Sequence, residues 1–165
     1  MSIHVLDIVE DTTVDGPGFR TSIYCAGCAH HCPGCHNPQS WATDAGQEMD
    51  VEDIMQVIEA DPYAPGVTFT GGDPMQQPEG FAALATAIRQ RTNKNIWCYT
   101  GYTYEHILQM PAQRNLLSLV DVLVDGPYMA AQRSEELLFR GSANQRIIDV
   151  QQSLCTGQVV EWKRT

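Results

Sequence analysis

The stretch Gly66-Val67-Thr68-Phe69-Thr70-Gly71-Gly72-Asp73-Pro74 contains the unit from which the fold of this chain can be built. Its first five residues are rich in β-forming side chains and predict a buried strand that stops at the glycine pair. Downstream, apolar residues at helical spacing predict one buried helix face, formed by Phe81, Leu84, Ala85 and Ile88. A strand followed by an amphipathic helix is the repeating unit of a parallel sheet covered by helices.

The same alternation extends in both directions from this unit. Strands are predicted over residues 5–9, 21–24, 66–70, 95–100 and 120–124, and further helices over residues 104–110 and from about residue 50. Asp50 can cap the latter helix, whose apolar face is formed by Val51, Ile54, Met55 and Ile58. A complete eight-stranded barrel needs far more chain than 165 residues. The expected fold is therefore α/β, a single domain over residues 1–165 with a partial, open barrel.

The charge and hydropathy of the chain exclude several classes of function. Twenty acidic and ten basic residues give a net charge of −10, so on average the chain repels a phosphate backbone. No apolar run approaches the length of a membrane span, and the start of the chain lacks the basic-then-apolar layout of a signal peptide. We therefore expect a cytoplasmic protein with neither nucleic acid nor membrane as a partner.

Four of the six cysteines lie close together, in the segment Cys25-Ala26-Gly27-Cys28-Ala29-His30-His31-Cys32-Pro33-Gly34-Cys35. In a reducing compartment such a cluster is typical of metal binding or redox chemistry rather than of disulfides. One hypothesis is a zinc-binding interaction module that uses all four thiolates. Structural zinc usually takes two cysteine pairs that lie about a dozen or more residues apart. The gap between Cys28 and Cys32 is much shorter than this separation.

A 4Fe-4S cluster is the second hypothesis for this segment. A cubane has widely separated iron corners, so one tight loop can supply several of its thiolate ligands. Cys28, Cys32 and Cys35 have the spacing Cys-x3-Cys-x2-Cys, which provides three ligands and leaves one iron open. An open iron indicates chemistry rather than electron transfer alone.

This spacing resembles the signature of radical S-adenosylmethionine (SAM) enzymes, in which the open iron binds the amino and carboxylate groups of SAM. Reduction of the cluster there cleaves SAM to methionine and a 5′-deoxyadenosyl radical. The resemblance implies a partial open barrel of the radical SAM type, with Cys28, Cys32 and Cys35 as metal ligands. It implies a 4Fe-4S cluster and SAM as cofactors and no catalytic side chain, because cluster and SAM carry the chemistry. Cys25, Cys98 and Cys155 receive no ligand role.

Three further segments are similar to cofactor-binding positions of that superfamily. Gly71-Gly72-Asp73-Pro74 resembles the Gly-Gly-Glu motif, in which backbone groups hold the SAM amino group, and glycines at a strand end let a backbone approach a ligand. His36-Asn37 follows the third cysteine, where similar enzymes place an aromatic ring near the SAM adenine. Asp125 ends a predicted strand and can accept two hydrogen bonds from a ribose diol, although a turn or capping aspartate would look the same.

Two more motifs narrow the resemblance to one family. Asp15-Gly16-Pro17-Gly18-Phe19-Arg20 resembles a segment just before the cysteines in glycyl-radical-enzyme activating enzymes. It implies a loop at the mouth of the site, with Arg20 available to an anionic or carbonyl partner. Residues 140–146 are similar to a Gly-Ser-x-Asn-Gln-Arg stretch near the end of one such enzyme. The chain up to about Val150 thus resembles the activating proteins of anaerobic (class III) ribonucleoside-triphosphate reductase.

That resemblance implies an oxidoreductase that generates the glycyl radical of this reductase. The expected partners are the reductase itself, through its C-terminal glycine loop, and flavodoxin as the electron donor. An activating enzyme of another glycyl radical enzyme, of the pyruvate formate-lyase type, is an alternative of the same chemistry. Those chains are usually longer and often carry Gly-Gly-Glu. His30 and His31 are expected to line a polar loop around the cluster.

Overall fold

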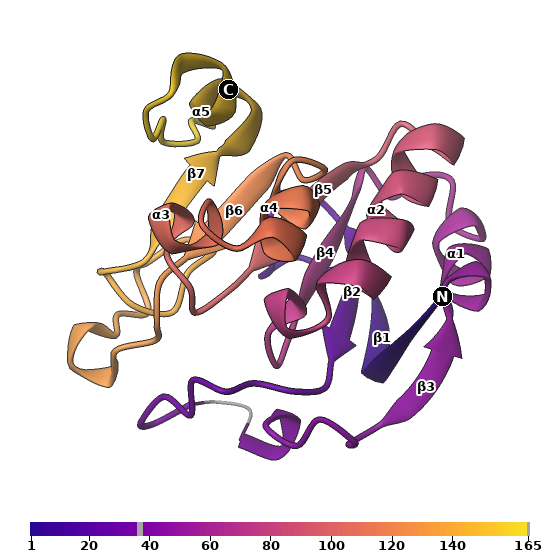
Figure 1. The fold of residues 1–165 in the computed structure, drawn as a ribbon, viewed down its shortest axis with the longest axis horizontal. Helices are drawn as coiled ribbons and strands as arrows, with labels where there is room; N and C mark the ends of the chain where they lie inside the picture. Colours follow the sequence, from indigo (N-terminus) through magenta and orange to yellow (C-terminus); the bar gives the residue numbers. More distant parts are fainter. Residues whose placement is uncertain (36–37, 165) are drawn as a thin grey trace.

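In the described part of the chain, residues 1–35 and 38–164 of a computed structural model, seven strands form one mixed sheet (Figure 1). The strands are β1 (Ser2–Thr12), β2 (Arg20–Cys25), β3 (Gln47–Asp50), β4 (Gly66–Gly71), β5 (Asn95–Tyr99), β6 (Val122–Asp125) and β7 (Arg146–Asp149). Their order is β3-β1-β2-β4-β5-β6-β7. The pairs β2–β4, β4–β5 and β5–β6 are parallel, whereas β1, β3 and β7 pair antiparallel at the flanks. The sheet is open, with β3 and β7 at its edges, which confirms the predicted α/β class.

Five helices are present among the described residues. They are α1 (Val51–Glu59), α2 (Pro78–Arg91), α3 (Tyr104–Ile107), α4 (Pro111–Leu117) and α5 (Val150–Thr156), with 3-10 turns η1 (Pro38–Ser40), η2 (Pro74–Gln76) and η3 (Ala130–Gln132). In Figure 1, α1, α2 and α4 lie beside one another over one face of the sheet. No helix in this described portion is both long and apolar enough to cross a membrane.

The apolar faces predicted for α1 and α2 are confirmed by burial. Ile54, Met55 and Ile58 of α1 are fully buried, and the Asp50 side chain accepts a hydrogen bond from Glu52 N at its start. On α2, the Phe81 ring lies 4.8 Å from the ring of Phe69 on β4. These contacts join helices and sheet into the main core, because apolar area removed from water stabilises by about 25 cal/mol per Å².

The helix predicted over residues 104–110 differs from the structure. Helix α3 ends at Ile107, and a separate helix α4 begins at Pro111. Proline suits the first turn of a helix, since its missing N–H has no partner there, but it interrupts a helix that arrives from upstream. The last predicted strand also begins later, at Val122 rather than Val120.

The face of the sheet opposite these helices carries a second, aromatic core. Trp97 of β5 packs edge-on against Phe139, 5.4 Å away, and against Trp162, 4.9 Å away. Trp162 lies in the tail beyond Val150, and its backbone N–H donates to the carbonyl of Ile147 on β7, 2.8 Å away. The tail thus covers the aromatic side of β5 and β6.

Arg20 lies on this same face and is fully buried, so the expectation that it would be available to a partner is wrong. Its guanidinium donates to Thr68 Oγ1 (2.8 Å) and to the carbonyl oxygens of Pro17 (3.1 Å) and Val67 (3.0 Å). It also lies 5.6 Å from the centre of the Trp97 ring, within range of a cation–π contact. Burial lowers the pKa of Arg20 to about 10, which still leaves it charged at neutral pH. Arg20 therefore ties the 15–18 turn to the sheet.

Candidate functional site

A cavity of about 480 Å³ opens where the parallel strands end. This volume is typical of small-molecule sites, which span about 300–1,000 Å³. Cys28, Cys32 and Cys35 all line the cavity. The other lining residues are Asp15, Tyr24, His30, Ser40, Thr70, Gly71, Gly72, Tyr99, Thr100, Gly101, Gly126, Tyr128, Gly141 and Gln145. The sheet thus brings together the cysteine segment and the turns after β4, β5 and β6, as expected at the carboxyl edge of parallel strands.

The donor set on this cavity is three soft thiol groups, which is the set that an iron–sulfur cubane takes from one loop. The Cys28 sulfur is half-buried, and burial raises its pKa. The backbone N–H groups of His30 and His31 partly offset this rise in pKa. In the part of the chain that the structure describes, no three His, Cys, Asp or Glu side chains converge closely enough to hold a metal ion.

Cys25 lies apart from the other three cysteines. It is fully buried in the main core at the end of β2, and the cavity lining of the described residues does not include it. Burial raises the pKa of its thiol well above the usual range, which disfavours the thiolate that a metal requires. A zinc site with four thiolates would therefore have to pull Cys25 out of the core.

The glycine pair after β4 brings two backbones together. Gly72 N donates to Cys25 O and Asp73 N to Gly27 O, both at 2.8 Å. A Cβ atom at Gly72 would lie 2.5 Å from Gly27 O. At Gly71, φ is +102° and a Cβ would lie 2.4 Å from Cys25 N. Both glycines line the cavity, and their turn also packs against the loop after β2.

Gly71→Ala is therefore expected to destabilise the protein by about 3 kcal/mol or more, because it combines a positive φ with a clash against backbone. Gly157→Ala is the matched control: its φ is +75°, but a Cβ there meets nothing within 4 Å. That variant is expected to lose only about 1 kcal/mol. Urea unfolding of the apoprotein measures both, and equal losses would show that crowding is not what requires glycine at position 71.

Asp73 has a buried carboxylate that joins three loops. Its Oδ2 accepts from Thr100 Oγ1 and from Gly101 N, both at 2.9 Å, and lies 2.6 Å from His30 Nε2. Its Oδ1 accepts from Met75 N at 2.9 Å, which caps η2. Among the described residues, the cavity lining includes the two preceding glycines but not Asp73. The carboxylate thus holds the walls of the cavity from behind.

Asp125 is also buried and is bonded within the protein. Arg146 donates to it through Nε (3.0 Å) and Nη2 (2.5 Å), and Tyr104 N donates at 2.8 Å. The side-chain bonds to Asp125 raise the pKa of Arg146. Gly126 lies on the cavity instead. The Asp125 carboxylate already accepts three hydrogen bonds. A ribose that binds it, as predicted, would have to compete with these donors.

The predicted adenine-side residues, His36 and Asn37, lie outside the described residues. His31 has a φ of +46°, and its ring stacks on Trp41 with 4.3 Å between centres. His30 lines the cavity, in keeping with a polar loop around the cysteines. Trp41 also accepts a backbone hydrogen bond from Cys28 N, at 3.3 Å, so the segment after η1 supports the cysteine loop.

Several cavity residues were missed from the sequence. Tyr24 OH donates to Asp15 Oδ2 at 2.7 Å, and Tyr99 OH donates to Phe139 O at 2.5 Å. Burial is the main reason that the pKa values of both phenols are raised, so both stay protonated. Successive side chains of a strand point to opposite faces of the sheet. This alternation along β2 and β5 could have indicated that Tyr24 and Tyr99 lie on the face opposite α1 and α2.

The motif at residues 140–146 builds the last wall. Gln145 Oε1 accepts from Gly141 N (2.9 Å) and Ser142 N (3.2 Å), and its Nε2 donates to Gly126 O (3.0 Å). Arg140 donates to Gln145 O at 2.7 Å. Hydrogen bonds of Gln145 and Arg140 thus hold the segment after β6 against the start of β7, beside the cavity.

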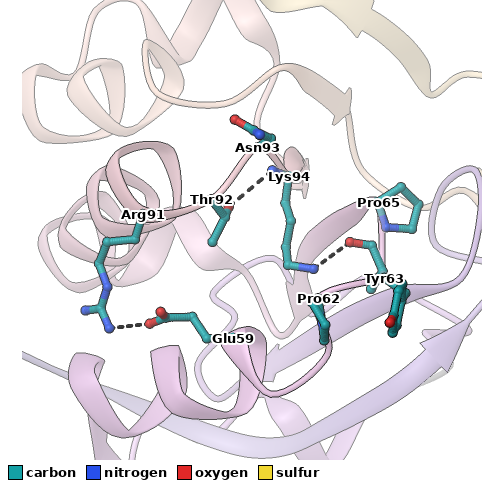
Figure 2. Close-up of a pocket in the computed structure, with 9 residues that line it drawn as sticks. Glu59, Pro62, Tyr63, Pro65, Arg91, Thr92, Asn93 and Lys94 are labelled. Carbon is teal, nitrogen blue, oxygen red and sulfur yellow. Dashed lines mark hydrogen bonds and ion pairs between the residues drawn. The ribbon is translucent and has the colours of Figure 1, made fainter.

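A second hollow, of about 380 Å³, lies at the opposite edge of the sheet, before β4 and β5 begin (Figure 2). Arg91 forms ion pairs with Glu52 and Glu59 on α1. Lys94 Nζ donates to the carbonyl oxygen of Ala64, 2.5 Å away. Figure 2 shows Arg91 turned toward Glu59, and the Lys94 ammonium turned toward a backbone carbonyl oxygen. Both cations at this hollow are already bonded within the protein, Arg91 to carboxylates and Lys94 to backbone carbonyl oxygens, which indicates a structural joint between α1, α2 and the strands.

Comparison with known proteins identifies relatives over most of the chain. A family model described as a 4Fe-4S single cluster domain matches residues 14–148. The anaerobic ribonucleoside-triphosphate reductase-activating protein of Vibrio cholerae is 38% identical over 141 residues, covering 81% of this chain and 90% of that protein. Proteins of the same name from phage T4 and Escherichia coli K12 are 36% and 34% identical, covering 81% and 80% of this chain and 86% and 89% of theirs.

Among solved structures, QueE from Escherichia coli resembles the fold, with a TM-score of 0.53 and 19% identity. The match covers 62% of this chain and 54% of QueE. The chain therefore spans about half the length of QueE. This similarity confirms the expected α/β architecture, in which helices cover a sheet that stays open.

Proposed function

Because the chain belongs to the family of the anaerobic ribonucleoside-triphosphate reductase-activating proteins, we propose that it generates the glycyl radical of such a reductase, using a 4Fe-4S cluster and SAM. The observation that carries the proposal is that Cys28, Cys32 and Cys35 line one cavity at the carboxyl edge of the sheet. In this proposal, residues 1–165 act as a single radical SAM domain. A cytoplasmic location remains a prediction from the sequence.

Each wall of the cavity has its own part in this function. The thiolates of Cys28, Cys32 and Cys35 would hold the cluster and leave one of its irons without a protein ligand, open to SAM. When bound there, the cluster would supply the one-electron chemistry that cleaves SAM to methionine and a 5′-deoxyadenosyl radical. The backbone of Gly71 and Gly72 forms a side-chain-free wall suited to the SAM amino group. Asp73 and Asp125 act in this proposal by holding those walls in place. His36 and Asn37 lie outside the described residues, and the resemblance alone assigns them to the SAM adenine.

The remaining residues of the site need no acid–base role. The glycine loop of the reductase enters the cavity, and its α-carbon loses a hydrogen atom rather than a proton. Tyr24 and Tyr99 stay protonated and reduce the space open to water. Flavodoxin is the electron donor that we propose.

The alternatives predict different outcomes. A pyruvate formate-lyase type activator has the same chemistry, but the named relatives reported above act on the ribonucleotide enzyme according to their names. A zinc-binding interaction module requires Cys25 as a fourth ligand, and that side chain is enclosed by the core.

The test is anaerobic reconstitution with iron and sulfide, reduction with dithionite, and addition of SAM. We expect 5′-deoxyadenosine to form, and a glycyl radical to appear by EPR when the cognate ribonucleotide reductase is present but not with pyruvate formate-lyase. A colourless protein with stoichiometric zinc and no SAM cleavage would overturn the proposal.

A further inference from the structure

His30 occupies the centre of the gap between Cys28 and Cys32, where the cysteine spacing itself calls for no particular residue. The ring is mostly buried, with 17% of its side chain exposed, and it lines the same cavity as the cysteines. Its contacts are more specific than those of a residue that only lines a polar loop.

The His30 ring lies in a slot formed by the ends of β4 and β5. Its Nε2 lies 2.6 Å from Oδ2 of Asp73, which is 1% exposed and also accepts from Thr100 Oγ1 and Gly101 N. Tyr102 meets the ring edge-on, 4.5 Å between centres. A Cβ atom at Gly101 would lie 2.6 Å from the ring, so the slot depends on glycine at that position. The sheet edge is therefore shaped around this imidazole.

This side chain links the cysteine segment to the sheet. The backbone bonds from Cys28 N to Trp41 O and from Cys35 N to Cys32 O stay within the excursion between β2 and β3. The backbone bonds from Gly72 and Asp73 to the segment end before Cys28, at Cys25 O and Gly27 O. The His30 side chain instead reaches Asp73, 43 positions away along the chain. An anchor in the gap between the first two cysteines limits how far their loop can move.

The anchored stretch directly follows Cys28. His30 and His31 come two and three positions after Cys28, so their backbone N–H groups can donate to its sulfur. His31 adopts a φ of +46° and is itself held by stacking on Trp41. Hydrogen bonds to cluster sulfurs raise the reduction potential of iron–sulfur clusters, because they stabilise the charge added on reduction. Holding the loop thus also holds these donors.

We propose that His30 is a positioning residue for the cluster. Asp73 orients the His30 ring, and the ring keeps the backbone N–H groups of residues 30 and 31 within hydrogen-bonding reach of the Cys28 sulfur. The inference rests on the proposed function, since it assigns a role toward the cluster that Cys28 would ligate. It predicts that loss of the His30–Asp73 bond shifts the cluster to a more negative potential.

The test compares His30→Gln with His30→Met in reconstituted protein without SAM. Glutamine can still donate to Asp73, whereas methionine has a similar size and no donor. We expect His30→Met to lower the equilibrium constant for one-electron reduction about tenfold, or ~59 mV, in an EPR-monitored titration. We expect His30→Gln to restore most of that loss. His106→Ala is the matched control, because His106 touches Tyr102 but is exposed and lies 5.5 Å from it between ring centres.

Equal potentials in the glutamine and methionine variants would overturn the inference, and so would a shift in His106→Ala as large as that in His30→Met. Iron and sulfide content, measured on the same samples, shows that each variant holds its cluster. A wild-type protein without a cluster would overturn the proposed function itself, so the two failures are distinguishable.

Discussion

Alanine at any one of Cys28, Cys32 and Cys35 is expected to reduce glycyl-radical formation to background and to leave reconstituted protein short of iron. Each of these thiols lines the cavity, and a methyl group offers no replacement ligand. The loss of the cluster is measured by iron and sulfide analysis and by the visible spectrum. The loss of glycyl-radical formation is measured separately by EPR of the reductase. Because the three side chains lie at the cavity surface, the apoproteins are expected to unfold within about 0.5 kcal/mol of wild type in urea.

Two other cysteines provide the controls for this series. Cys155→Ala changes an exposed side chain on α5 and is expected to leave cluster content and activity unchanged. Cys25→Ala removes a small buried side chain and is expected to keep the cluster at a cost of about 1–2 kcal/mol in stability. Loss of bound metal in Cys25→Ala as well as in the three cavity variants would favour the zinc module. Full retention in any one of the cavity variants would contradict the ligand assignment.

Arg20→Met is expected to cause the largest loss of stability, about 3–5 kcal/mol. The variant removes the donors to Thr68 Oγ1 and to the carbonyl oxygens of Pro17 and Val67, and buried acceptors left without a donor cost about 1–3 kcal/mol each. It also removes the cation–π contact with Trp97. Urea unfolding of the apoprotein measures the effect.

The control for Arg20 is Arg133, an exposed arginine that makes one long ion pair. Arg133 is 55% exposed and lies 3.9 Å from the Glu135 carboxylate. Arg133→Met is expected to change stability by less than about 0.5 kcal/mol, since exposed ion pairs contribute little. A loss below about 1 kcal/mol in Arg20→Met would mean that the turn over residues 15–18 is held by contacts other than this guanidinium.

Local patterns predicted most of the fold because helices and buried strands leave a periodic signal in consecutive residues. The faces of α1 and α2 and the central strands β2, β4 and β5 were found in this way. The edge strands β3 and β7 were missed, since each has only four residues and pairs with a partner remote in sequence. Arg20 was misjudged for a related reason: its acceptor Thr68 lies 48 positions away.

The candidate site was predictable to the extent that its residues follow one another. The cysteine spacing and the glycine pair are local motifs, and the structure places both on the cavity. The partners of Asp73 and Asp125 come from other loops, so a sequence pattern could not show that these carboxylates are already bonded. His30 was treated as part of a polar loop because its slot exists only once β4 and β5 are in place.

The bond between His30 and Asp73 also sets an order of events during protein synthesis. Domains form as the chain emerges, amino-terminal segments first, and parallel strands pair only after the later strand has been made. The three cysteines leave the ribosome before Asp73, Thr100 and Gly101, the residues that hold their loop. A nascent chain that has reached only β3 therefore exposes these thiols without their support. Delivery of iron and sulfide is therefore expected to succeed only after Thr100 and Gly101 have been made and β5 has joined the sheet.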